Sequence, residues 1–295
     1  MIRRLALASL FVCSCGSTQP VVTDAGEDSG VMVVTDAGDE VDSGMADAGT
    51  PDAGTPEDAG TPDAGSVDAG SADLDGDGLD DAYELQLAQD YLPVLGVHPQ
   101  DGCPLGGLLF RARKHPQDPT LIFILYVHLF ERDCGITSHV GDDEVFAITV
   151  NPATPAPQGI TAMRAISHQG TICQKVSTCG TCGGNSACET ESGRPIIYSS
   201  KDKHGTYTSL SACNQLTCLD QCVVGNRMGV PLVNAGEPNA HLVEDLTDGG
   251  FITAANGWTQ ASVMHFNPWG APDFAGAGNV ANDLGDSAFD TPACR

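Results

Sequence analysis

Three residues near the middle of the chain could together bind a metal ion or transfer protons. His139, Asp142 and Glu144 lie in the segment SHVGDDEVFAITV. The second half of this segment has the two-residue side-chain alternation typical of a strand. Alternate residues of a strand share a face, so Asp142 and Glu144 should project together, and Gly141 permits His139 to turn back toward them. This set suits calcium, magnesium or manganese, or acid–base chemistry. The alternative is a polar strand end with solvated carboxylates.

The elements around these residues have the pattern of a β protein. Leu121–Val127 is a continuous apolar run rich in β-branched and aromatic residues, as in a buried strand. Weaker strand patterns cover Ile160–Ser167, Arg194–Ser200 and Ala261–Phe266. We therefore predict a mainly β fold, a disulfide-stabilised antiparallel β-sandwich with a short N-terminal helix after a disordered acidic tether.

A second candidate metal site precedes the strands, in the sequence DLDGDGLDDAYE. Its spacing matches a twelve-residue calcium loop, whose ligands are carboxylates and one backbone carbonyl. A helix from about Asp80 to Asp90 should follow, and the alternative is an acidic end of the linker. The predicted calcium ligands are Asp73, Asp75, Asp77, Leu79 (through its carbonyl), Asp81 and Glu84.

The N-terminal quarter indicates export. Arg3 and Arg4 precede an apolar run and then small residues, as in a signal peptide. The sequence ending at Cys15 resembles a bacterial lipobox, which predicts lipidation of Cys15 and an envelope lipoprotein at the surface or outer membrane. Plain secretion after cleavage near Gly16 is the alternative. The predicted organisation is a signal peptide at 1–16, a disordered Asp-Ala-Gly-rich tether at 17–72, a calcium loop and helix at 73–90 and a β-sandwich domain at 91–295.

The net charge and the number of cysteines indicate which partners and which cellular compartment to expect. The formal net charge is −26, and no Lys or Arg occurs between Arg4 and Arg111, so nucleic acid is not expected as a partner. An even number of cysteines in an exported chain predicts up to five disulfides. Zinc or redox chemistry at Cys179 and Cys182 is the weaker alternative. The cysteines beyond the signal are Cys103, Cys134, Cys173, Cys179, Cys182, Cys188, Cys213, Cys218, Cys222 and Cys294.

Short motifs in order along residues 91 to 270 carry a family resemblance. The chain resembles the Vps62-related proteins and, more distantly, the necrosis-inducing (NPP1-like) proteins. One departure is Asp143, which stands where the central motif H-x-G-D-W-E has tryptophan. The matching residues are Tyr91, Pro93, His98, Pro99, His139, Gly141, Asp142, Glu144, His168, Arg194, Pro195, Tyr198, His204, Tyr207, Trp269 and Gly270.

The resemblance implies a divalent-metal site on a β-sandwich, formed here by His139, Asp142 and Glu144. It also implies that His204 joins them and that His168 is a neighbour. Three function classes remain open: a binding module for a glycan or lipid headgroup, a metal-dependent hydrolase, or a passive disulfide-hardened surface protein. No GxSxG, P-loop, Rossmann or HExxH motif is present, and we favour the binding module because no complete catalytic set is visible.

Overall fold

The structure is a computed structural model that describes residues 72–180, 187–215, 218–227, 229–270, 274, 279–285 and 287–290. The chain divides into two units, Met1–Asp63 and Ala64–Arg295, and all described residues belong to the second. The predicted signal peptide, the predicted lipidation site Cys15 and all of the predicted tether except residue 72 lie outside the described residues. Among the described residues, no helix is both long and apolar enough to cross a bilayer.

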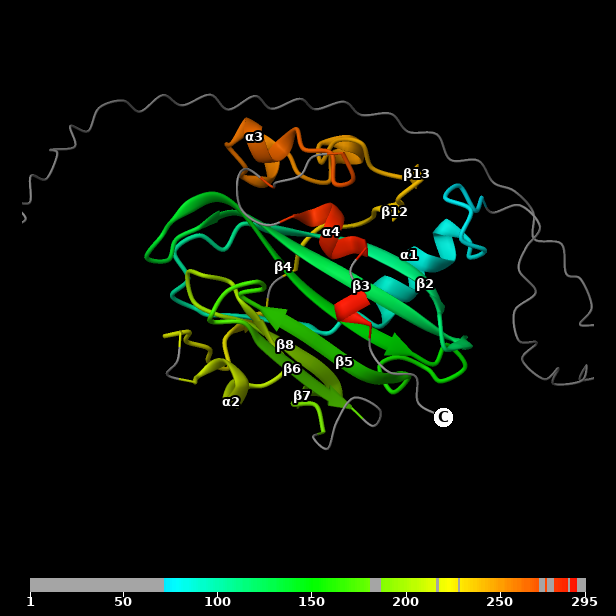
Figure 1. Ribbon diagram of the computed structural model, residues 1–295, viewed down its shortest axis with the longest axis horizontal. Coiled ribbons are helices and arrows are strands. Elements are labelled where there is room, and N and C mark those ends of the chain that lie inside the picture. Colours follow the sequence, from blue (N-terminus) through cyan, green and yellow to red (C-terminus); the bar gives the residue numbers. More distant parts are fainter. Residues whose placement is uncertain are drawn as a thin grey trace, which may run out of the picture. The chain divides into compact units, whose positions relative to one another are not determined.

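A six-stranded sheet forms the centre of the domain, in the order β11-β2-β3-β4-β5-β6 (Figure 1). Its neighbours are antiparallel except β11 and β2, which run parallel. The strands are β2 (Gly106–His115), β3 (Asp118–Asp133), β4 (His139–Val150), β5 (Ile160–Ser167), β6 (Lys175–Gly180) and β11 (Leu232–Asn234).

A second, five-stranded sheet has the order β10-β1-β8-β7, with β9 also paired to β8. The pairing of β1 with β8 is parallel, so the prediction of antiparallel strands holds for most pairs but not all. A separate short hairpin is formed by β12 and β13. These strands are β1 (Val94–Val97), β7 (Thr190–Glu191), β8 (Arg194–Ser199), β9 (Thr206–Tyr207), β10 (Asn226–Arg227), β12 (Gly236–Glu237) and β13 (Ala240–His241).

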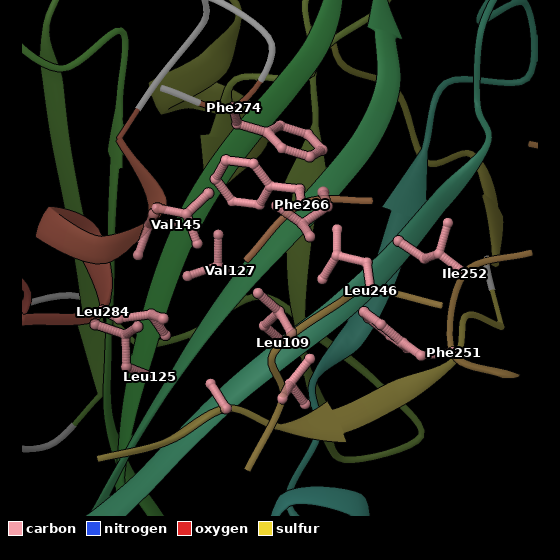
Figure 2. Close-up of a cluster of buried hydrophobic side chains, with 14 of the residues drawn as sticks. Leu109, Leu125, Val127, Val145, Leu246, Phe251, Ile252, Phe266, Phe274 and Leu284 are labelled. Carbon is pink, nitrogen blue, oxygen red and sulfur yellow. The ribbon is translucent and has the colours of Figure 1, made fainter. Parts of the chain in front are cut away.

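The six-stranded sheet is buried on both faces, which explains the continuous apolar run in β3. Phe110, Tyr126 and Phe146 of the six-stranded sheet belong to one buried cluster. Leu95 of β1 and Ile197 of β8, in the second sheet, belong to the same cluster, so this core layer joins the two sheets. The opposite face is covered by the C-terminal segment. Figure 2 shows this second layer, where the labelled residues include Leu109, Leu125, Val127, Val145, Leu246, Phe251, Ile252, Phe266, Phe274 and Leu284.

The predicted N-terminal helix is present as α1 (Asp81–Asp90), and Asp80 caps it by accepting from the N–H groups of Ala82 and Tyr83. Leu87 and Ala88 bury its inner side in the core layer between the sheets. The Tyr126 hydroxyl donates to the Ala88 carbonyl at 2.8 Å and fixes the helix to β3. The helix after the predicted calcium loop is therefore part of the folded core.

The C-terminal segment contains short helices where the sequence suggested a strand. The predicted strand at Ala261–Phe266 is wrong, because Ala261–Met264 forms the short helix α3. Val263 and Phe266 still bury their side chains against the sheet, so burial rather than strand pairing accounts for the apolar pattern. The remaining described helices are α2 (Leu210–Cys213), α4 (Val280–Gly285) and the 3-10 turns Asp248–Gly250, Ala254–Asn256 and Ser287–Phe289.

Four disulfides join described cysteines and bear out the prediction of a disulfide-stabilised fold. Three of them lie within residues 173 to 222, so they brace the segment that carries β6, β7, β8 and β9. Cys182 and Cys294 lie outside the described residues. The pairs are Cys103–Cys134, Cys173–Cys218, Cys179–Cys188 and Cys213–Cys222.

Candidate metal centre and acidic pocket

An acidic pocket opens at the start of β4, where β4 is paired with β3 but not yet with β5. β4 pairs with β3 from His139 onward, but its ladder with β5 begins only at Val145, opposite Ile166. The pocket at this open edge has a volume of about 970 Å³. It is lined by Asp133, Thr137, His139, Asp142, Asp143, Glu144, Val145, Ile166, His168, Gln169, Thr171, Lys203, Asn279, Ala281, Asn282, Asp283 and Gly285.

Asp142 and Glu144 lie on one face of β4, as the alternation predicts, and both are buried. The Thr206 N–H donates to Glu144 Oε2 at 3.3 Å, so β9 lies against this carboxylate. Asp143 faces the other way and meets the carboxyl group of Asp283 in α4. Three consecutive acidic side chains thus enter one pocket from two faces of a single strand.

His204 contacts Asp142 directly, but both of its ring nitrogens are already occupied. Nδ1 lies 2.9 Å from Asp142 Oδ2, and Nε2 lies 3.3 Å from Asp101 Oδ1. The ring stacks on Phe130 with centroids 3.7 Å apart. Burial lowers the pKa of His204, but the bonds to the two carboxylates outweigh it and raise the pKa to about 9. In this arrangement His204 is a cation that neutralises Asp142, and its predicted role as a metal ligand would require it to lose a proton.

His139 turns toward its own turn and toward β3. Its Nδ1 donates to the Gly141 carbonyl at 2.6 Å, and its Nε2 lies 3.6 Å from Asp133 Oδ2. Gly141 has φ 75°, in the left-handed region that favours glycine, which gives the turn its shape. His139 therefore lines the same pocket as Asp142 and Glu144, but no hydrogen bond joins it to either of them among the described residues.

His168 lies on the pocket wall and is held from behind by Asp220. Its Nε2 lies 2.5 Å from Asp220 Oδ2, and the Tyr207 hydroxyl donates to the same oxygen. Asp220 is almost fully buried, and Lys203 Nζ lies 3.4 Å from its other oxygen. Burial raises the pKa of Asp220, but the bonds from His168 and Tyr207 outweigh it and lower the pKa. An aspartate that orients an imidazole in this way also occurs behind metal-bound and proton-accepting histidines.

The pocket has more buried carboxylates than cations to neutralise them. Burial raises the pKa of Glu144 well above its ordinary value, and the charges of Asp142 and Asp143 add to this. Burial likewise raises the pKa of Asp143, with Asp283 as the next cause, and Asp143 Oδ2 is buried without a hydrogen-bond partner. A divalent cation would relieve this repulsion, so the donor chemistry fits a hard metal ion.

The three predicted ligands of the acidic pocket are not close enough together to hold one ion in the observed arrangement. Two groups of described residues bring three ligand atoms within 4.8 Å of one another, and the His139, Asp142 and Glu144 set is not one of them. The first group, Asp101, Cys103 and His204, includes a cysteine that is already in a disulfide. An ion held by His139, Asp142 and Glu144 together would therefore need their side chains to move closer together.

The second of these groups, Asp73, Asp75 and Asp81, belongs to the predicted calcium loop. Asp73 accepts from the N–H groups of Gly76 and Gly78 at 2.7 and 3.0 Å, which folds the loop around its carboxylates. Burial raises the pKa of Asp75 to about 6, and the charge of Asp77 contributes. The loop thus has the shape and the unmet charge of a cation site.

Glu84, the last predicted ligand, is fully buried beneath the loop. Its Oε2 accepts from Asn234 Nδ2 at 2.7 Å, whereas its Oε1 has no partner. Asp77 Oδ2 is also buried and without a partner. Burial raises the pKa of Glu84 to about 8, and the charges of Asp77, Asp75 and Asp81 add to it, while the bond from Asn234 opposes it.

The sequence pointed to one wall of the acidic pocket and missed the others. In the sequence, Asp143 stands out only as a departure from the family motif, although in the structure it faces Asp283. Asp101 and Asp220, the partners of His204 and His168, carried no signal because each is more than fifty residues from its histidine. Only the folded chain brings these groups together.

No family model matches the chain, and a search of curated proteins finds no match, so the resemblance to Vps62-related proteins stays a prediction. A structure described as a toxin fold for microbial attack and plant defence is 16% identical, with a TM-score of 0.29 over 51% of this chain and 73% of that one.

Two further structures show the same level of similarity. NLPPya in complex with glucosamine is 17% identical, with a TM-score of 0.30 over 57% of this chain and 80% of that one. NLPPya in complex with mannosamine is 16% identical, with a TM-score of 0.29 over 57% and 81%. TM-scores this low do not establish a shared fold.

Proposed function

We propose that this protein is an exported surface protein whose acidic pocket binds a divalent cation and, with it, a glycan. The observation that carries the proposal is the cluster of buried carboxylates at the start of β4, which has too few cations around it. Asp142 and Glu144 would hold the ion, with His139 at the pocket wall. The bound ion would supply positive charge to which a ligand oxygen can coordinate.

The pocket lining favours a neutral ligand rich in hydroxyl groups. Thr137, Thr171, Asn279 and Asn282 offer hydroxyl and amide groups that can bind sugar hydroxyls. An anionic lipid headgroup would meet the carboxylates, so a glycan is the better fit of the two predicted ligand classes. The volume of about 970 Å³ is large enough for a short oligosaccharide.

Cation binding in the pocket can be tested by calorimetry with calcium and manganese. The background should carry Asp75→Ala, which disables the loop, so that only the pocket is measured. We expect one ion per chain in this background and none after Asp142→Asn is added. Asp90→Asn, an exposed change at the end of α1, is the matched control and should leave binding intact. Unchanged binding in the Asp142→Asn protein would overturn the proposal.

Glycan recognition is tested separately on a glycan array with calcium and with EDTA. We expect binding that requires the ion and disappears in Asp142→Asn but not in Asp90→Asn. A protein that binds the ion but no glycan would leave the passive surface role as the better account.

A second candidate function, hydrolysis, is favoured by the pair formed by His168 and Asp220. An imidazole fixed by a buried carboxylate on the wall of a metal-binding pocket can accept a proton from water. If the protein is a hydrolase, a glycan bound in the presence of the ion should be cleaved over time, and His168→Gln should bind it without cleaving it. Product analysis by mass spectrometry separates this from simple binding.

We also propose that the loop from Asp73 to Glu84 binds calcium. The buried, unpartnered oxygens of Glu84 and Asp77 support this, because each lacks the hydrogen bond that a buried polar atom normally has. With one loop and no paired second loop, the affinity should be in the range of about 0.1–1 mM typical of extracellular sites. Calcium heat that persists unchanged after Asp75→Ala and Asp77→Ala together would refute the site.

Export and lipid anchoring complete the proposed picture. The four disulfides support an oxidising compartment outside the cytoplasm. Attachment of lipid at Cys15 would link the protein to a membrane. Radiolabelled palmitate that is incorporated into the wild type but not into Cys15→Ser would support the anchor, and equal incorporation would rule it out.

A further inference from the structure

We infer that the calcium site extends beyond its twelve-residue loop onto strand β11, where Asn234 positions the ligand Glu84. The inference rests on the proposed calcium binding of the loop. It assigns a role to a residue 150 positions away from Glu84 in the chain, and it makes the bound ion a link between the N-terminal loop and the central sheet.

The first step is the position of Glu84. It lies in the first turn of α1, and its side chain is fully buried, so the carboxylate cannot be solvated. Only one of its oxygens has a partner, Asn234 Nδ2 at 2.7 Å. The other, Oε1, is buried and has none, and its carboxyl group lies among the charges of Asp77, Asp75 and Asp81. A buried carboxylate with one unsatisfied oxygen beside other carboxylates is suited to a cation.

The second step is the rigidity of Asn234. Its Oδ1 accepts from the Gly236 N–H at 3.0 Å, which orients the amide so that Nδ2 donates to Glu84. Asn234 itself lies in β11, which pairs with β2 through Phe110. The Ala235 N–H continues this pairing by donating to the Phe110 carbonyl at 2.8 Å. The donor that holds Glu84 is thus fixed by the central sheet.

The third step is Gly236, which no other residue could replace without strain. Its φ is 73°, and a Cβ atom there would lie 2.7 Å from the Ala240 carbonyl oxygen. This backbone shape lets the Gly236 N–H reach back to Asn234. The turn therefore serves the metal site indirectly by fixing the side chain that fixes Glu84.

Residues that orient a metal ligand typically change metal affinity by about 10–100-fold when they are replaced. Asn234→Leu keeps the approximate size of the side chain and removes both polar atoms. We expect it to weaken calcium binding by about 10-fold or more. Asn256→Ala, an exposed asparagine in the 3-10 turn Ala254–Asn256, is the matched control and should bind calcium like the wild type.

Calcium affinity can be measured on the full chain by titration with terbium, whose luminescence Tyr83 within the loop can sensitise, followed by competition with calcium. Near-UV circular dichroism reports whether each variant is folded. A folded Asn234→Leu protein with wild-type calcium affinity would overturn the inference. Absence of terbium and calcium binding in the wild type would instead refute the loop site itself, so the two failures are distinguishable.

A second measurement avoids the risk that Asn234→Leu does not fold. In the ¹⁵N-labelled wild type, the side-chain amide resonance of Asn234 should shift during the calcium titration with the same midpoint as calcium binding. A resonance that stays in place while calcium binds would contradict the role of Asn234.

Discussion

Replacing Glu84 by Gln should change stability in opposite directions with and without calcium. Burial and the neighbouring carboxylates raise the pKa of Glu84 from 4.5 to about 8. Between these values the unfolded chain releases the proton while the folded chain retains it, so calcium-free stability falls as the pH rises from 4.5 toward 8. Each pH unit in this window costs about 1.4 kcal/mol, which gives a penalty of about 3 kcal/mol at pH 7.

Gln carries no charge and so removes this penalty. In EDTA at pH 7, we expect Glu84→Gln to be more stable than the wild type by up to about 3 kcal/mol. In excess calcium the order should reverse, because the wild type gains binding energy and the variant lacks a charged ligand.

Urea denaturation followed by circular dichroism measures both differences. The same pair of proteins compared at pH 4 provides the control, because Glu84 is then largely protonated in the folded and unfolded chains alike. The calcium-free difference should be small there. A variant that is less stable than the wild type in EDTA at pH 7, or a difference that does not depend on pH, would refute the reasoning.

Three other predictions concern other interactions of the folded chain. Burial lowers the pKa of His128 to about 3, and the charge of His204 is a smaller cause. As the pH falls below 6.5, the wild type should therefore lose up to about 1.4 kcal/mol of stability per pH unit relative to His128→Leu. Urea denaturation at several pH values measures this difference. Arg111 donates to Glu237 and to the Leu284 carbonyl, so Arg111→Met should destabilise the protein by about 3 kcal/mol. Adding Glu237→Gln should restore part of this stability, because it removes the unpaired charge. Equal losses of stability in the single and double variants would show that the unpaired Glu237 charge is not the cause. Alkylation of the exported protein without reduction should add no label by mass spectrometry, and any added label would indicate a free thiol.

Local sequence determined the elements whose pattern is itself local. The apolar run of β3, the alternation of β4 and the Asp80 cap of α1 each arise from neighbouring residues, and the structure contains all three elements. The face shared by Asp142 and Glu144 follows from the same period of two. The apolar pattern at Ala261–Phe266 misled because a short buried helix and a strand cannot be distinguished over so few residues.

The partners of the site residues were decided only by the tertiary structure. His204 meets Asp101 across 103 positions, and Glu84 meets Asn234 across 150. No local pattern encodes such pairs, because they depend on which strands become neighbours in the sheets. The sequence therefore specified which groups could bind cations. The packing of α1, β4, β9 and β11 determined which carboxylates are buried, and hence where a cation would relieve the most repulsion.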